Sequence, residues 1–179
     1  MLEQLIGPLA LDGVAFLLPA APGGSWYPGR FDSPAGANEP WLTRALDRCE
    51  RALERLRAAG VPSTRIALVG FSQGACLAAT LLAERRPQVA AAAILTGALI
   101  VPAGQRPRVA RPLDGVVVTI TCGPRDEWVP LDRARASAEA LAAARAKVRF
   151  LVRDDPLHRI SAEDVDAVRQ LLAPLRSPP

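Results

Sequence analysis

Short apolar runs alternate along the chain with longer amphipathic stretches. Each run is rich in Val, Ile, Leu or Ala and is followed by polar, Gly or Pro positions, which is typical of a buried strand. Such strands, separated by helical patterns, predict a mostly parallel sheet flanked by helices. The expected fold class is therefore α/β, with strands at Val14–Leu18, Ile66–Val69, Ala91–Leu95, Val116–Thr121 and Val148–Val152.

The clearest helical pattern spans Glu39 to Ala59, where apolar residues recur three and four positions apart. We expect Asn38 to cap this helix, Pro40 to lie in its first turn and Gly60 to follow its end. Residues 101–113 contain three prolines and predict a loop. Further helices are expected over Leu2–Leu11, Gln73–Arg85 and Asp132–Ala146, and after the capping motif Ser161-x-x-Asp164.

Composition indicates one globular domain over residues 1–179, since half of the residues are hydrophobic. No apolar run reaches the roughly 20 residues of a membrane helix, and Met1 to Gln4 lack the basic start of a signal peptide. We therefore expect a cytoplasmic protein with no stable membrane insertion.

The net charge of +4 is spread along the chain. Its densest stretch, Arg44 to Arg57, is interleaved with acidic residues, which indicates a solvated helix face and no nucleic-acid partner. Cys49, Cys76 and Cys122 show no C-x-x-C spacing, so we interpret them as buried free thiols and expect no metal site.

Gly70-Phe71-Ser72-Gln73-Gly74 matches G-x-S-x-G between a predicted strand and a predicted helix. In that setting the serine occupies a sharp, strained turn that exposes its oxygen above the sheet. We expect a side chain at either flanking glycine to crowd this turn, and the backbone N–H of Gln73 to donate to a developing oxyanion. The alternative is a glycine-rich turn that serves backbone geometry only.

A serine hydroxyl is a weak nucleophile and needs an adjacent base. The chain has one histidine, His158, in a loop after the last predicted strand. The base in turn needs a carboxylate that fixes its tautomer. Asp126 follows the fourth predicted strand and completes the chain order Ser, Asp, His; Asp154 and Asp155, close to His158 in sequence, are its rivals.

These motifs resemble the bacterial phospholipase/carboxylesterase family, relatives of acyl-protein thioesterases. The resemblance implies hydrolysis of a small-molecule carboxylic ester or thioester through an acyl-enzyme, without metal or organic cofactor. Under this hypothesis Trp26, Tyr27 and Phe31 line an acyl pocket; alternatively, they pack their loop onto the sheet. The similar stretches are Gly24–Pro28, Ala37–Trp41, Gly70–Ala75, Asp126-x-x-Val129-Pro130 and His158-x-Ile160-Ser161.

The chain departs from the family pattern at its start, where the family has strands and a His-Gly loop that supplies a second oxyanion donor. We interpret the chain as truncated or mis-started there, with Val14–Leu18 matching the family's fourth strand. Without its usual neighbour, this strand either pairs with the one at Ile66 or the region is loose. Loss of one oxyanion donor typically lowers turnover about 100- to 1000-fold.

Two other functions stay open. One is a catalytically weak or inactive truncated domain that acts as a binding or scaffold module. The other is a lactone hydrolase with a cysteine nucleophile, which is less favoured because Ser72 occupies the elbow and Cys76 lies a turn into the helix. The sequence also leaves the oligomeric state open, a homodimer included.

Overall fold

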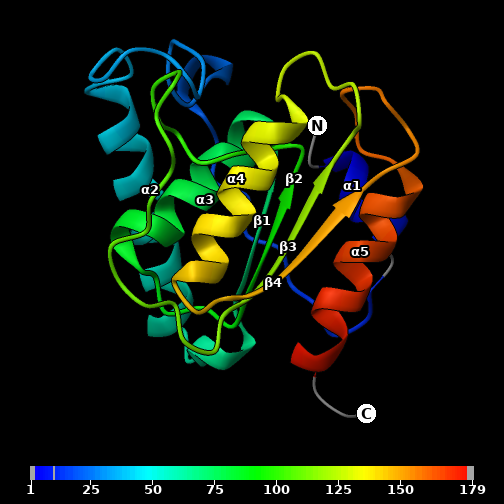
Figure 1. Ribbon diagram of the computed structural model, residues 1–179. Helices are drawn as coiled ribbons and strands as arrows, with labels where there is room; N and C mark the ends of the chain where they lie inside the picture. Colours follow the sequence, from blue (N-terminus) through cyan, green and yellow to red (C-terminus); the bar gives the residue numbers. More distant parts are fainter. Residues whose placement is uncertain (1–2, 10, 177–179) are drawn as a thin grey trace.

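The computed structural model describes residues 3–9 and 11–176. At its centre lies a parallel sheet with the order β1 (Ala67–Phe71), β2 (Ala91–Leu95), β3 (Val117–Cys122) and β4 (Lys147–Val152). Helices cover both faces of the sheet (Figure 1). The predicted α/β class is confirmed. One face carries α2 (Trp41–Ala58), α3 (Gln73–Arg85) and α4 (Leu131–Ala143), and the other carries α1 (Glu3–Leu9) and α5 (Ala162–Leu172).

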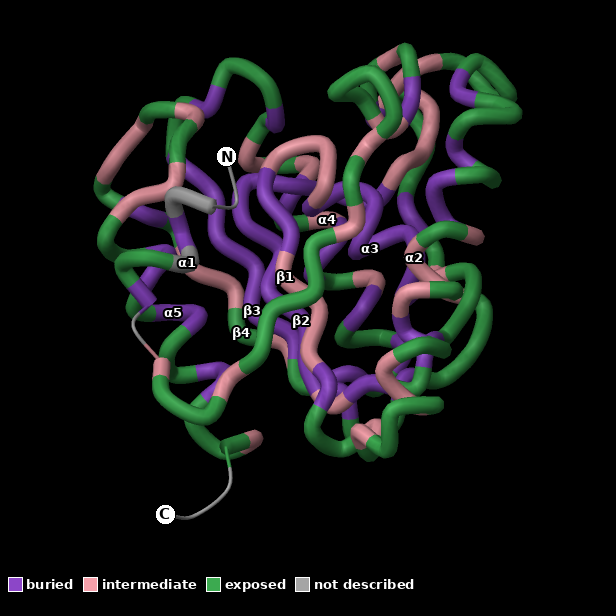
Figure 2. Tube along the Cα trace, turned by 180° about the vertical axis from the view of Figure 1, so that it is seen from behind, coloured by how far each residue is buried: buried purple, intermediate pink, exposed green. Residues whose placement is uncertain are grey.

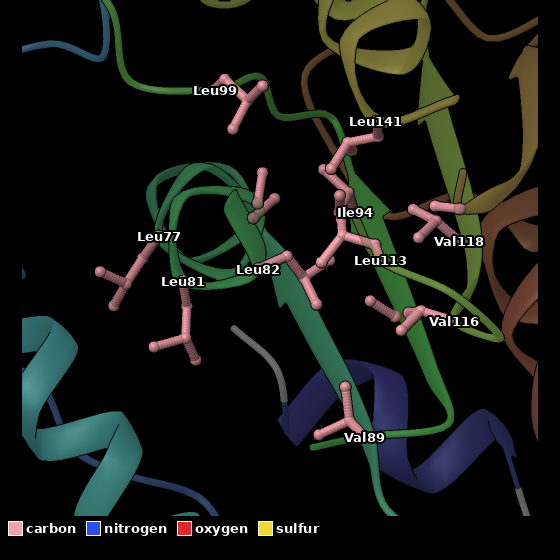
Figure 3. Close-up of a cluster of buried hydrophobic side chains, with 14 of the residues drawn as sticks. Leu77, Leu81, Leu82, Val89, Ile94, Leu99, Leu113, Val116, Val118 and Leu141 are labelled. Atoms are coloured by element: carbon pink, nitrogen blue, oxygen red, sulfur yellow. The ribbon is translucent and has the colours of Figure 1, made fainter. Parts of the chain in front are cut away.

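The two central strands, β2 and nearly all of β3, are buried on both faces, whereas β1 and β4 at the edges of the sheet are only partly buried. In β2, Ile94 belongs to the core cluster on the α3 side, whereas Ala93 and Leu95 belong to the cluster against α1 and α5. Figure 2 shows buried residues concentrated at the central strands, β2 and β3, and exposed residues mostly on the outer segments. Figure 3 shows Leu82 of α3 and Ile94 among the side chains of the first cluster.

Most predicted elements are confirmed within a few residues of their bounds. The loop at 101–113 carries no helix or strand, and Ser161 caps α5 through a reciprocal capping box with Asp164. The predicted first helix is confirmed as α1, although Leu2 and Ala10 lie outside the described residues. Short 3₁₀ turns occur at Pro22–Gly24, Ser63–Arg65 and Ala173–Leu175.

The predicted strand at Val14–Leu18 is wrong. This segment has no strand assignment, and among the described residues β1 pairs only with β2. Phe16, Leu17 and Leu18 are 38, 46 and 45% exposed. An apolar run forms a strand only when a neighbour accepts its backbone hydrogen bonds, and here the segment does not pair with β1.

A cavity of about 520 Å³ lies along the outer edge of β1. Its lining includes Val14–Pro19 on one side and Ala67–Gly70 on the other. At one end it reaches Trp26 and Gly74, close to the serine turn. The segment that was expected to extend the sheet is therefore separated from it by this cavity.

Asn38 does not cap α2, so that prediction is also wrong. Pro40 is the residue that precedes the helix, and the N–H of Thr43 in the first turn donates to the Glu39 carboxylate (3.3 Å). Asn38 is instead buried, and its side-chain amide accepts a hydrogen bond from the N–H of Gly29 (2.8 Å) and donates one to the carbonyl of Arg30 (2.9 Å). Asn38 thus fixes the aromatic loop that precedes the helix.

Among the described residues, no helix is both long and apolar enough to cross a bilayer.

Candidate active site

The predicted site residues follow the carboxyl ends of the parallel strands. Ser72 comes directly after β1, Asp126 lies between β3 and α4, and His158 lies between β4 and α5. Since parallel strands end at the same edge of a sheet, loops from distant parts of the chain meet there. This edge is where open α/β sheets bind their ligands.

Ser72 occupies a strained backbone conformation between β1 and α3, with φ 54° and ψ −122°. Positive φ is uncommon for a residue with a Cβ and is maintained only where the surroundings impose it. The N–H of Ser72 donates to the carbonyl of Leu95 (3.0 Å), and the carbonyl of Ser72 accepts from the N–H groups of Ala75 and Cys76. The turn is thereby tied to β2 and to the first turn of α3.

The two flanking glycines differ in the space around them. A Cβ at Gly70 would lie 2.3 Å from the carbonyl oxygen of Gly74, whereas a Cβ at Gly74 would approach nothing closer than the Trp26 indole nitrogen at 3.8 Å. The expectation that both glycines are required for the turn is therefore wrong for Gly74. Only at Gly70 would a side chain enter the close contact between the backbones of the strand and the helix.

His158 bridges the serine and a carboxylate. Its Nε2 lies 2.7 Å from Ser72 Oγ, and its Nδ1 lies 2.9 and 3.0 Å from the two carboxylate oxygens of Asp126. Asp126 is buried, and its Oδ1 also accepts from the N–H groups of Trp128 (2.9 Å) and Val129 (2.8 Å). The three predicted residues thus form one continuous hydrogen-bonded chain.

The two rival carboxylates do not contact the imidazole. Asp155 accepts from the N–H of Leu157 and from Arg159 Nε, and these bonds, the backbone one foremost, lower its pKa below the usual value. The backbone N–H of Asp154 donates to Glu163 (3.3 Å). Asp155 therefore contacts the loop that carries His158, whereas Asp126 contacts the imidazole itself.

Two aromatic rings flank His158. The ring of Phe71 lies 5.2 Å from the imidazole between centroids, and the indole of Trp128 lies 6.1 Å away, both tilted by about 45°. Phe71 is buried and Trp128 is 58% exposed. The imidazole is thus packed on one side by a core residue and on the other by a solvent-facing indole.

Gln73 is the first residue of α3, so its backbone N–H has no partner within the helix. This N–H is therefore a candidate oxyanion donor beside Ser72, at the positive end of the helix dipole. The sequence motif predicted no role for the Gln73 side chain. The amide accepts from the N–H of Trp26 (2.8 Å) and donates to the carbonyl of Tyr27 (2.8 Å), which fixes the aromatic loop against the elbow.

The three aromatic residues of that loop have different surroundings. Tyr27 and Phe31 are buried in the core, and burial raises the pKa of the Tyr27 hydroxyl well above its usual value. These positions fit packing of the loop better than contact with a substrate. Trp26 is partly exposed and lines the cavity beside β1.

The three cysteines are free thiols as expected; Cys76 and Cys122 are buried, whereas the expectation of burial is wrong for Cys49, which is partly exposed. Within the described parts of the chain, no group of three His, Cys, Asp or Glu side chains is placed to hold a metal ion.

Comparison with known proteins places the chain among esterases. The family model for phospholipase/carboxylesterase matches residues 15–175. A crystal structure of a phospholipase/carboxylesterase from Dyadobacter fermentans is 29% identical, with TM-score 0.77, over 84% of this chain and 72% of that one. No protein in a search of curated proteins matches.

Two carboxylesterases of lower identity share the fold. The enzyme from Mesorhizobium loti is 23% identical with TM-score 0.73, over 96% of this chain and 81% of that one. The enzyme from Bacillus cereus is 19% identical with TM-score 0.66, over 77% of this chain and 63% of that one. With a family match across nearly its whole length and a sheet that ends in a serine elbow, the chain belongs to the phospholipase/carboxylesterase family of α/β-hydrolases.

Proposed function

We propose that this protein hydrolyses small carboxylic esters or thioesters with Ser72 as nucleophile, His158 as base and Asp126 as the residue that orients the base. The observation that carries the proposal is the 2.7 Å distance between His158 Nε2 and Ser72 Oγ, together with Asp126 on Nδ1. A nucleophile within hydrogen-bond reach of a base that is itself held by a third group is the arrangement of serine hydrolases.

In the first step Ser72 Oγ attacks the carbonyl carbon and its proton passes to His158 Nε2. The backbone N–H of Gln73 donates to the oxyanion that forms. The tetrahedral intermediate collapses as His158 returns the proton to the departing alcohol or thiol. The acyl group is then bonded to Ser72.

Water releases the acyl group by the same route. His158 Nε2 takes a proton from the attacking water, the second tetrahedral intermediate collapses, and the proton returns to Ser72 Oγ with release of the acid. Asp126 stays ionised and stabilises the imidazolium in both halves of the reaction.

The surroundings of the cysteines argue against a cysteine nucleophile. Burial raises the pKa of Cys76 to about 11 and that of Cys122 to about 12. Because the thiolate is the reactive form, thiols with such pKa values are nearly inert at neutral pH. The lactone-hydrolase alternative that relies on a cysteine is therefore not supported.

A fluorophosphonate probe tests the proposal, because it labels only a serine that is activated by a base. We expect the wild-type chain to be labelled at Ser72 and to release p-nitrophenol from short p-nitrophenyl esters. Ser72→Ala should lose both activities. Ser63→Ala, in the 3₁₀ turn before β1, is the matched control and should retain them. A folded wild-type chain that shows neither labelling nor turnover would favour a non-catalytic binding or scaffold module.

A further inference from the structure

A buried ion pair lies beside the site and is not used by the proposed reaction. Arg153 directly follows β4, Asp164 lies in the first turn of α5, and both side chains are fully buried. Arg153 Nη1 lies 3.0 Å from Asp164 Oδ2. Burying two charges is costly because both leave water, so such a pair is weak evidence for stability on its own.

The Arg153 guanidinium makes further contacts, and these are with the backbone next to His158, the proposed base. Arg153 Nη1 donates to the carbonyl of Arg159 (2.8 Å), and Nη2 donates to the carbonyl of Leu157 (3.2 Å). These two residues are the immediate neighbours of His158 in the chain. One planar, rigid group therefore holds the backbone on both sides of the imidazole.

The same group is anchored to the rest of the sheet edge. Arg153 Nη2 also lies 3.2 Å from Thr96 Oγ1, just after β2, and the backbone N–H of Arg153 donates to the carbonyl of Cys122 at the end of β3. Asp164 accepts from Thr121 Oγ1 in β3 and from the N–H of Ser161 (2.8 Å). The loop that carries His158 is thus tied to β2 and α5 by the Arg153 guanidinium, and to β3 by the Arg153 backbone and by Asp164.

We infer that Arg153 is a positioning residue for His158: by holding the carbonyls of Leu157 and Arg159, it fixes the imidazole at the distance from Ser72 that proton transfer requires. The expected loss of kcat rests on the proposed function, whereas the positioning of the imidazole by Arg153 does not. Arginine suits this task because its fork presents several donors in a fixed plane. Lysine keeps the charge but offers a compact ammonium that cannot reach all of these acceptors in one geometry.

Arg153→Lys is the central test, with Arg149→Lys as its matched control. Arg149 lies on β4, four residues before Arg153, is exposed and contacts Gln170. We expect Arg153→Lys to lower kcat on p-nitrophenyl esters about 10- to 100-fold, as a shift of about 1 Å in a reacting group does. KM should stay within about twofold, because the lost contact acts on the chemical step. Arg149→Lys should behave as wild type.

The single histidine supplies a second measurement, the NMR signals of its imidazole. These signals would not change if Arg153 had a merely structural role. In a chain labelled with ¹⁵N-histidine, every imidazole signal belongs to His158. Wild type and Arg149→Lys should show one narrow set of signals, including a downfield proton on Nδ1 shared with Asp126. In Arg153→Lys we expect shifted or broadened signals and faster solvent exchange of that proton.

A second variant separates positioning from folding. Arg153→Met with Asp164→Asn removes both charges together, so no uncompensated charge stays buried. We expect this double variant to unfold in urea near the wild-type midpoint and still to show the loss of kcat and the altered His158 signals.

Wild-type kcat and unchanged His158 signals in folded Arg153→Lys would overturn the inference, as would failure of both variants to fold. A wild-type chain without turnover would refute the proposed function alone, since the imidazole signals would still decide whether Arg153 positions the ring.

Discussion

Asp126 shows how a single carboxylate is held in one orientation. Its Oδ1 accepts from two successive backbone N–H groups, of Trp128 and Val129, while both oxygens lie within 3.0 Å of His158 Nδ1. The carboxylate therefore cannot rotate without losing backbone hydrogen bonds. In the proposed mechanism Nδ1 carries the proton that it donates to Asp126, which leaves Nε2 free to accept the proton of Ser72.

Asp126→Asn should separate this role from simple packing. An amide keeps the shape but favours the wrong imidazole tautomer, so we expect kcat to fall by about 10⁴-fold with little change in the free energy of unfolding. Turnover of p-nitrophenyl esters and urea unfolding measure the two quantities.

Asp155→Asn is the control for that experiment. Its carboxylate contacts Leu157 and Arg159 in place of the imidazole, and Asn keeps an oxygen that accepts the Leu157 N–H. We expect activity within about fivefold of wild type, because partly exposed ion pairs contribute at most about 1 kcal/mol. A loss as large as that of Asp126→Asn would identify Asp155 as the functional acid instead.

At the scale of the elements, the serine turn depends on how closely β1 and α3 approach each other. A Cβ at Gly70 would meet the backbone of Gly74 and Ala75 within 2.7 Å, and a Cβ at Gly97 would meet the Ala75 side chain at 2.4 Å. Both glycines therefore allow α3 to begin directly against the sheet edge. The position of the Gln73 N–H beside Ser72 follows from this approach.

Substitutions at the two motif glycines should have opposite consequences. Gly70→Ala should destabilise the fold by roughly 1–3 kcal/mol or more, because backbone atoms would have to move. Gly74→Ala should be neutral or stabilising by up to about 1 kcal/mol, because glycine within a helix is entropically unfavourable. Urea unfolding of both variants checks this, and equal destabilisation would contradict it.

The sequence predicted the elements best where local signals are strong. The periodic apolar face of α2 and the Ser161-x-x-Asp164 motif depend on neighbouring residues alone, and both are found in the structure. Asn38 was misassigned because a polar residue before a helix has the same local pattern whether it caps the helix or binds the preceding loop. Arg153 carries no local signal, since its partners lie up to 57 positions away.

At the scale of the whole molecule, the edge of the sheet at β1 is open and faces a cavity. Among residues 3–9 and 11–176, β1 has no strand on its outer side, and the cavity there is bordered by Phe16, Leu17 and Leu18. The strand predicted at Val14–Leu18 was wrong for a reason at this scale. A strand needs a neighbouring strand to pair with, and the periodicity of one segment does not reveal whether that neighbour exists. Open strand edges and contiguous apolar surfaces favour self-association.

Leu17→Lys should therefore reduce both hydrophobic-dye binding and concentration-dependent association. Trp41→Lys, which removes an exposed apolar side chain at the start of α2, is the matched control and should change dye binding less. Dye fluorescence and light scattering across a concentration series measure the two effects. Equal responses of the two variants would show that the edge of β1 is not the apolar surface involved.

The indole of Trp128 gives this molecule an optical reporter on its single imidazole. It lies 6.1 Å from the only imidazole of the chain and is largely exposed to solvent, whereas Trp26 lies in the loop beside Gly74 and Trp41 begins α2. A change in the position of the imidazole alters the surroundings of this indole. Trp128 emission should therefore change in Arg153→Lys but stay at the wild-type value in Arg149→Lys, and Trp128→Phe should abolish the difference.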